Sequence, residues 1–276
     1  MAMIFAALVL AASAGFAEEP KELTVFTAAS LTGAFSEIGH MYENETNIDV
    51  VFNFDGSQAL RTQMENGAYA DVFASANNKQ MNALRSLGLM NNSSVSVFTN
   101  NKLSLIIPRN NPAGISNLSD LAKPGVKIVI GTKDVPVGDY ALQIINKLGN
   151  DSAYGPDYKE LVLANIISQE TNVNYVVTKI ALGEADVGFA YVSDVTEDLS
   201  NKVDRIEIPD EYNIIAEYPM GMLKDSKYPA EAEEFVNLVK SEEGRAVLEK
   251  YGFAPVADSV VTSAKTGSKD KPMAAA

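Results

Sequence analysis

Short apolar runs alternate with amphipathic, helix-type repeats through most of the chain. The first apolar run, Leu23 to Thr27, is followed at once by apolar residues at helical spacing, namely Leu31, Ala34, Phe35, Ile38, Met41 and Tyr42. Ser30 stands between the two patterns, where a helix needs a capping residue. The pattern therefore predicts a strand that runs directly into a helix N-terminus, with Ser30 as the N-cap.

The same alternation of strand and helix repeats along the chain. We expect further strands over residues 48–53, 71–75, 103–108, 126–131, 186–191 and 215–223. We expect helices over 58–65, 79–87, 137–148, 173–182, 230–240 and 242–251, and leave 158–161 and 164–167 unassigned. This alternation predicts open α/β sheets with crossover connections. The Asn/Pro/Gly-rich stretch 110–117 indicates that a second domain begins near there.

The two ends of the chain differ in composition from its middle. Residues 1–16 are apolar and rich in small side chains, and a polar stretch follows Ala17, which is typical of a secretory signal peptide cleaved after Ala17. No Lys or Arg precedes the apolar run, as one usually does in a signal peptide, so the true start codon could lie upstream. The alternative is an uncleaved membrane anchor, but about 16 apolar residues fall short of the ~20 that span a bilayer. Residues 258–276 carry almost no large apolar side chains, and we expect a disordered tail. We therefore expect a chain secreted across the cytoplasmic membrane and located in the periplasm or at the cell surface.

Composition and charge exclude several classes of function. A length of 276 residues with 46% hydrophobic content suits two modest packed domains. The formal net charge of −14 argues against nucleic acid and anionic membranes as partners. The chain has no cysteine and a single histidine, which excludes disulfides, iron–sulfur clusters, thiolate zinc sites, cysteine nucleophiles and multi-histidine metal sites.

Several spaced motifs, in one order, resemble the periplasmic molybdate-binding proteins of ABC importers. The matching stretches are Thr24 to Leu31, Asp55 to Leu60, Ala70 to Ala76, Gly131 to Tyr140, Gly183 to Asp194 and Lys250 to Phe253. The resemblance covers roughly residues 22–257, nearly the whole expected mature chain. Several motifs in a fixed order are far more specific than any one of them.

The resemblance implies a type II periplasmic-binding-protein fold, in which two α/β lobes are joined by a hinge and the ligand lies in the cleft between them. It implies a first lobe over residues 20–103, a second lobe over 104–217 and a return to the first lobe over 218–257. In this family hydroxyl groups and backbone amides hold molybdate or tungstate. The matching residues here are Ser30, Ser57, Val137, Val173 and Tyr191. The serines would donate through Oγ and N–H, the valines through N–H alone, and Tyr191 through its phenol.

Four of these residues, all except Tyr191, also lie in the first turn of helices that the hydrophobic pattern predicts. The N–H groups of a first turn have no partner inside the helix and carry the positive end of its dipole, so they attract an anion. Such local donors can bind a dianion even in a chain of net charge −14, because distant charges are screened. Since molybdate and tungstate have nearly equal size and charge and are larger than sulfate, we expect both to bind and sulfate to be rejected.

We expect a binding protein and not an enzyme, with no cofactor and no metal beyond the oxyanion itself. The expected partners are the oxyanion and the membrane permease of an ABC importer, and we expect the chain to be a monomer. One alternative is a binding protein for another tetrahedral oxyanion, such as sulfate or phosphate. A second is an enzyme on the same fold, such as a porphobilinogen deaminase, but that enzyme attaches its cofactor through a cysteine, which this chain lacks.

The sequence leaves open whether a carboxylate joins the ligand shell, as is thought for a related group of binding proteins. No Asp or Glu occupies the matched positions, but Asp134, Asp139 and Glu170 lie close to them in sequence. The affinity, the preference between molybdate and tungstate, and the surface that docks on the permease also stay open.

Overall fold

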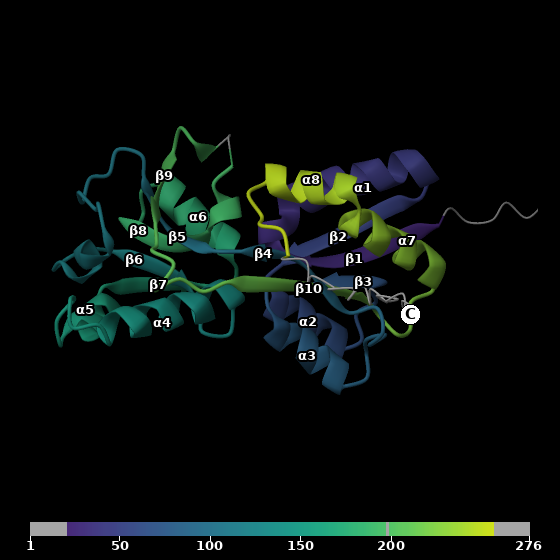
Figure 1. The fold of residues 1–276 in the computed structure, drawn as a ribbon, viewed down its shortest axis with the longest axis horizontal. Helices are drawn as coiled ribbons and strands as arrows, with labels where there is room; N and C mark the ends of the chain where they lie inside the picture. The colour runs from purple at the N-terminus through teal and green to yellow at the C-terminus, as the bar shows by residue number, and fades with distance from the viewer. Residues whose placement is uncertain (1–20, 197–198, 257–276) are drawn as a thin grey trace, which may run out of the picture.

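The computed structural model of the chain describes residues 21–196 and 199–256. The predicted signal peptide (1–17) and the predicted tail (258–276) lie outside the described residues. Figure 1 shows two lobes side by side, each built on one sheet with helices on both of its faces. This confirms the predicted two-lobed α/β fold.

The first sheet has five strands in the order β2-β1-β3-β10-β4. Their bounds are β1 (Glu22–Ala28), β2 (Asp49–Asp55), β3 (Val72–Ala74), β4 (Ser96–Asn101) and β10 (Ala216–Met222). Strand β1 is parallel to β2 and β3, whereas β10 runs antiparallel to β3 and β4. The carboxyl ends of β1, β2 and β3 therefore share one edge of the sheet, which is where ligands bind in open α/β sheets.

The second sheet repeats this design with the order β7-β6-β8-β5-β9. Its strands are β5 (Leu103–Pro108), β6 (Ile128–Gly131), β7 (Ile166–Glu170), β8 (Val187–Tyr191) and β9 (Val203–Glu207). Strand β6 is parallel to β7 and β8, and β5 is antiparallel to β8 and β9. The carboxyl ends of β6, β7 and β8 again meet at one edge.

Helices cover both faces of each sheet. In the first lobe, α1 (Thr32–Thr46), α7 (Pro229–Lys240) and α8 (Glu242–Lys250) lie on one face, and α2 (Ser57–Glu65) and α3 (Asn78–Ser86) on the other (Figure 1). In the second lobe, α4 (Pro136–Gly149) and α5 (Tyr158–Ala164) lie opposite α6 (Val173–Ala181). Short 3₁₀ turns are η1 (Ala29–Leu31), η2 (Leu118–Ala122) and η3 (Val192–Asp194). None of the helices within the described ranges is long and apolar enough to cross a membrane.

The chain crosses between the two sheets twice. It leaves the first sheet after β4, enters the second at β5, and returns between β9 and β10. The segment near the end of the described chain pairs with the outer strand of the first sheet, because Asn100 and Ala254 exchange both backbone hydrogen bonds. The two crossings make the connection between the lobes.

The structure corrects one local prediction and fills gaps in others. Ser30 is not the N-cap of the first helix, because the chain forms the turn η1 there and α1 begins at Thr32 without a side-chain cap. Strands β4 and β9 were not predicted; both lie at sheet edges, and polar residues interrupt their apolar pattern. Asn172 caps α6, since its side chain accepts the Tyr175 N–H.

Candidate functional site

A small cavity lies where the two lobes meet. All five residues predicted to bind the ligand line it, namely Ser30, Ser57, Val137, Val173 and Tyr191. No Asp, Glu, Lys, Arg or His stands among the described residues that line it. The two lobes thus share a site built from uncharged groups.

Three α-helices begin at this cavity because each follows a parallel strand at the ligand-binding edge of its sheet. Ser57 is the first residue of α2, after β2, and Val173 is the first residue of α6, after β7. Val137 is the second residue of α4, and Pro136 before it suits a helix start because proline has no N–H to lose. The first-turn N–H groups of these helices lack partners within their helices and attract negative charge.

Ser57 is oriented so that its hydroxyl proton is free. Its side chain is 1% exposed, and Oγ accepts a hydrogen bond from the Ala76 N–H at 3.0 Å. Because Oγ uses an acceptor lone pair in that bond, its own O–H can donate to a ligand. The strand–turn segment after β3 therefore sets the direction in which Ser57 donates.

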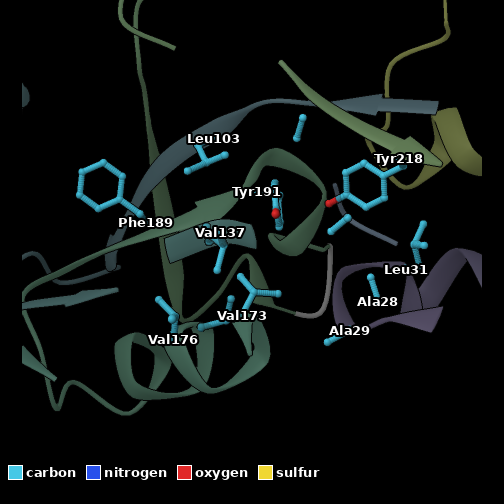
Figure 2. Close-up of a cluster of buried hydrophobic side chains, with 14 of the residues drawn as sticks. Ala28, Ala29, Leu31, Leu103, Val137, Val173, Val176, Phe189, Tyr191 and Tyr218 are labelled. Atoms are coloured by element: carbon cyan, nitrogen blue, oxygen red, sulfur yellow. The ribbon is translucent and has the colours of Figure 1, made fainter. Parts of the chain in front are cut away.

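Tyr191 ends β8 and carries a buried hydroxyl. Figure 2 shows its side chain between Val137 and Val173 of its own lobe and Ala28 and Tyr218 of the other. The residue is 1% exposed, and its hydroxyl has no hydrogen-bond partner among the described residues. Burial raises the pKa of Tyr191 well above 10.0, so the phenol keeps its proton. A buried, unpaired O–H at a cavity wall is costly unless a ligand accepts its hydrogen bond.

Ser30 lies in η1 and pairs with a residue that the sequence did not single out. Its Oγ is 2.9 Å from the hydroxyl of Tyr218, which is fully buried on β10. The two residues are 188 positions apart in the chain, and Tyr218 sits in an ordinary-looking apolar run, so no local signal in the sequence could have linked them.

Side-chain amides tie the two lobes together around the cavity. Gln58 Nε2 donates a hydrogen bond to the Thr171 carbonyl at 2.9 Å, and Asn172 Nδ2 donates one to Asp55 Oδ1 at 3.0 Å. Gln80 Nε2 donates across the lobes to the Asp134 carbonyl at 3.2 Å. A Cβ atom on Gly56 would lie 2.5 Å from the Thr171 carbonyl oxygen, so only glycine permits this approach. These contacts describe a closed arrangement of the lobes.

The three carboxylates that lie near the motifs do not line the cavity. Asp139 accepts a hydrogen bond from Gln143 Nε2 at 3.1 Å, and Glu170 pairs with Lys179 at 2.7 Å. Asp134 contributes only its carbonyl, to Gln80. The described residues hold no group of three or more acidic or histidine side chains suited to a metal ion.

The acidic side chain most closely tied to the proposed donors is Asp194. Its Oδ2 accepts the backbone N–H of Tyr191 at 2.7 Å. Burial raises the pKa of Asp194 to about 7, and the hydrogen bond from Tyr191 only partly offsets this. Asp194 thus fixes the end of the strand that carries Tyr191.

The comparisons with known proteins agree with this geometry. A family model described as bacterial extracellular solute-binding protein matches residues 23–254. The molybdate-binding protein ModA of Mycobacterium tuberculosis (strain ATCC 25618 / H37Rv) is 33% identical over 261 residues, which cover 92% of this chain and 95% of that relative.

Two solved structures show the same fold. The periplasmic molybdate-binding protein of Azotobacter vinelandii has a TM-score of 0.74 at 22% identity, and the match covers 85% of this chain and 99% of that one. The sulfate-binding protein SubI of Mycobacterium tuberculosis H37Rv has a TM-score of 0.77 at 16% identity, covering 86% and 88%. With a family model that spans most of its length, the chain belongs to the bacterial extracellular solute-binding proteins.

Proposed function

We propose that this protein captures molybdate, and also tungstate, outside the cytoplasm and delivers the anion to the membrane permease of an ABC importer. The ligand is held by Ser30, Ser57, Val137, Val173 and Tyr191. The observation that carries the proposal is the cavity itself, where three helix N-termini and the unpaired hydroxyl of Tyr191 converge. A cavity that offers hydrogen-bond donors but no acceptor side chains suits an oxyanion that carries no proton of its own.

Related proteins support the choice of ligand. ModA of Mycobacterium tuberculosis, which is 33% identical, is named a molybdate-binding protein. Each relative and solved structure cited above is named as a binding protein and not as an enzyme. The proposed role is therefore binding and delivery, with molybdate as cargo and not as cofactor.

The proposal includes the division into lobes and the site of action. The lobes cover residues 20–103 with 218–257, and 104–217, and the crossings of the chain between its two sheets support this division. The family's description as extracellular supports a periplasmic or surface location. The protein acts as a monomer, because each chain supplies donors from both of its own lobes.

The proposal is tested by calorimetric titration of the purified protein with molybdate, tungstate and sulfate. We expect one site per chain for molybdate and tungstate and no heat from sulfate. Tight binding of sulfate alone would contradict the choice of ligand and would favour the alternative that the fold of the sulfate-binding protein also permits. If none of the three anions gave a heat of binding, the proposed function as a whole would be contradicted.

The variant Ser57→Ala tests the donor assignment. It removes one charge-assisted hydrogen bond, worth about 1.5–3 kcal/mol, so the Kd for molybdate should rise at least about tenfold. Ser86→Ala is the control, because the Ser86 hydroxyl donates to a carbonyl within its own helix. If Ser57→Ala bound molybdate as tightly as the parent protein, Ser57 would not be a ligand donor.

A further inference from the structure

We infer that Tyr218 is a positioning residue for the proposed oxyanion site, and that it directs the hydroxyl proton of Ser30 into the cavity. The inference deepens the proposed function and rests on it. Tyr218 is not among the residues that line the cavity, so it acts through Ser30 and not by contact with the ligand.

The hydroxyls of Ser30 and Tyr218 form a partly buried pair, so each of their protons needs a hydrogen-bond acceptor. Tyr218 is fully buried, its hydroxyl lies 2.9 Å from Ser30 Oγ, and the Tyr191 ring is next to it. Burial raises the pKa of Tyr218 well above 10.0, so the phenol keeps its proton. Distance alone allows either oxygen to be the donor.

The two possible directions of this hydrogen bond differ in what they leave unpaired. If Ser30 donated, the proton of Tyr218 would have to turn to the neighbouring hydroxyl of Tyr191 or stay unpaired, and in either case Ser30 would have no proton left for a ligand. If Tyr218 donates, Oγ of Ser30 is satisfied as an acceptor and its own proton is free to point to an anion. With an oxyanion in the cavity, the second arrangement gives the protons of both Tyr218 and Ser30 an acceptor, and it makes Ser30 a donor like Ser57, whose Oγ accepts the Ala76 N–H.

The backbone of β10 and the surrounding rings hold Tyr218 in this position. The register between β10 and β4 shifts between Tyr218 and Pro219, and such irregularities re-aim a side chain near functional sites. The Tyr218 ring packs edge-on against Tyr191 at 5.7 Å and against Phe253 at 5.5 Å between ring centroids. Figure 2 shows Tyr218 on the far side of Tyr191 from Val137. One residue thus braces donors from both lobes.

A double-mutant cycle tests whether Tyr218 acts through Ser30. Tyr218→Phe keeps the ring and removes the hydroxyl, and we expect the Kd for molybdate to rise about tenfold. Ser30→Ala should weaken binding at least as much. In the double variant, Tyr218→Phe should add nothing to the loss caused by Ser30→Ala, because its effect passes through the missing serine. The measurement is calorimetry, with the melting temperature of each variant recorded alongside.

Tyr42→Phe is the matched control for the loss of a buried phenol. Tyr42 is 1% exposed, and its hydroxyl donates to the Glu231 carbonyl at 3.1 Å, away from the cavity. We expect it to lower the melting temperature and leave the Kd unchanged.

Two results would overturn the inference while leaving the proposed function intact: unchanged affinity in Tyr218→Phe, or fold-changes that multiply in the double variant. If the parent protein bound none of the three oxyanions, the proposed function and this inference would fail together. The inference is supported if Tyr218→Phe raises the Kd in the parent protein but not in the Ser30→Ala variant.

Discussion

Single residues decide the chemistry of the cavity, and the buried ones do so most strongly. The fold has already removed the hydroxyls of Ser57 and Tyr191 from water, which is unfavourable in free energy. A ligand that accepts their hydrogen bonds offsets that desolvation penalty. Asp194 shows the opposite case. It is a carboxyl whose charged form the fold disfavours, next to the strand end that carries Tyr191.

Asp194 makes the stability of the protein depend on pH near neutrality. Its pKa rises from 3.8 to about 7 in the folded protein, so between these values the folded state binds the proton more tightly than the unfolded state does. Stability should therefore fall as the pH rises through this window, by at most about 1.4 kcal/mol per pH unit. Asp194→Asn should flatten this dependence. Urea unfolding at pH 5 and pH 8 measures it, and an equal slope in parent and variant would contradict the assignment.

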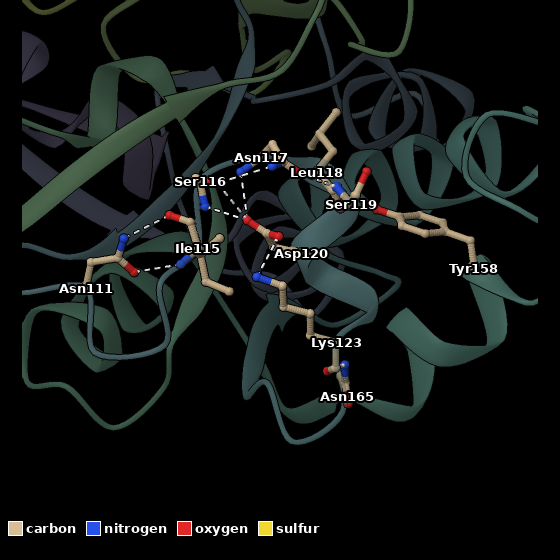
Figure 3. A network of polar contacts seen from close by, with 10 residues as sticks. All are labelled: Asn111, Ile115, Ser116, Asn117, Leu118, Ser119, Asp120, Lys123, Tyr158 and Asn165. Atoms are coloured by element: carbon tan, nitrogen blue, oxygen red, sulfur yellow. Dashed lines mark hydrogen bonds and ion pairs between the residues drawn. The ribbon is translucent and has the colours of Figure 1, made fainter.

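At the scale of elements, the site depends on where helices start. The cavity needs α2, α4 and α6 to begin at one place, and each start follows from local sequence together with a preceding parallel strand. Elsewhere in the second lobe, a smaller element, η2, is held by a dense polar network around Asp120 (Figure 3). This network anchors the long connection between β5 and β6.

Asp120 makes that connection sensitive to acid. Its carboxylate accepts hydrogen bonds from the Ser116 N–H at 2.7 Å and the Asn117 N–H at 3.2 Å, and it pairs with Lys123 at 2.8 Å. Burial by itself would raise the pKa of Asp120, but the hydrogen bonds from Lys123, Ser116 and Asn117 together outweigh it and lower the pKa from 3.8 to about 2. A lowered pKa stabilises the fold above pH 3.8, and that stability is lost as the pH falls through about 2.

We expect Asp120→Ala to destabilise the protein by about 1–3 kcal/mol at pH 7 and to have a smaller effect at pH 2. Asp157→Ala is the control, because Asp157 precedes α5 without a side-chain capping bond. Chemical unfolding at both pH values gives the comparison. An effect of Asp120→Ala that did not change with pH would contradict the role of its charge.

At the scale of the whole molecule, side-chain amides hold the two lobes together. The amides of Gln58, Gln80 and Asn172 each cross from one lobe to the other. These bonds lie close to the proposed donors in both lobes, so closing the lobes would also complete the proposed ligand shell. Contacts that exist only in the closed form should slow the release of ligand more than they change its capture.

Gln58→Ala should therefore raise the dissociation rate of molybdate about 2- to 10-fold, since one net hydrogen bond is worth about 0.5–1.5 kcal/mol. Gln63→Ala on the same helix is the matched control, because Gln63 accepts a hydrogen bond from Asn53 within its own lobe. Stopped-flow tyrosine fluorescence can follow release, as the chain has 11 tyrosines and no tryptophan. Equal dissociation rates in the two variants would mean that the bond across the lobes does not control release.

Much of the fold and of the candidate site was accessible from the sequence because the signals are local. Apolar spacing placed α2, α4 and α6 to within one or two residues, and the strand ending at Tyr191 was predicted with it. That five residues assemble into one cavity came from the resemblance to a family and not from spacing alone. Strands β4 and β9 escaped prediction because polar residues interrupt the apolar pattern of each.

The sequence by itself determined the starts of α2, α4 and α6, the absence of cysteine chemistry and the α/β character of the chain, since periodicity and composition are properties of neighbouring residues. Only the tertiary structure decided which groups meet. It turned Ser30 from an expected helix cap into the partner of Tyr218, and left the hydroxyl of Tyr191 buried without a partner among the described residues. The contact between Ser30 and Tyr218, which lie 188 positions apart, is set by the return of β10 to the first sheet beside β3, and no local pattern records that.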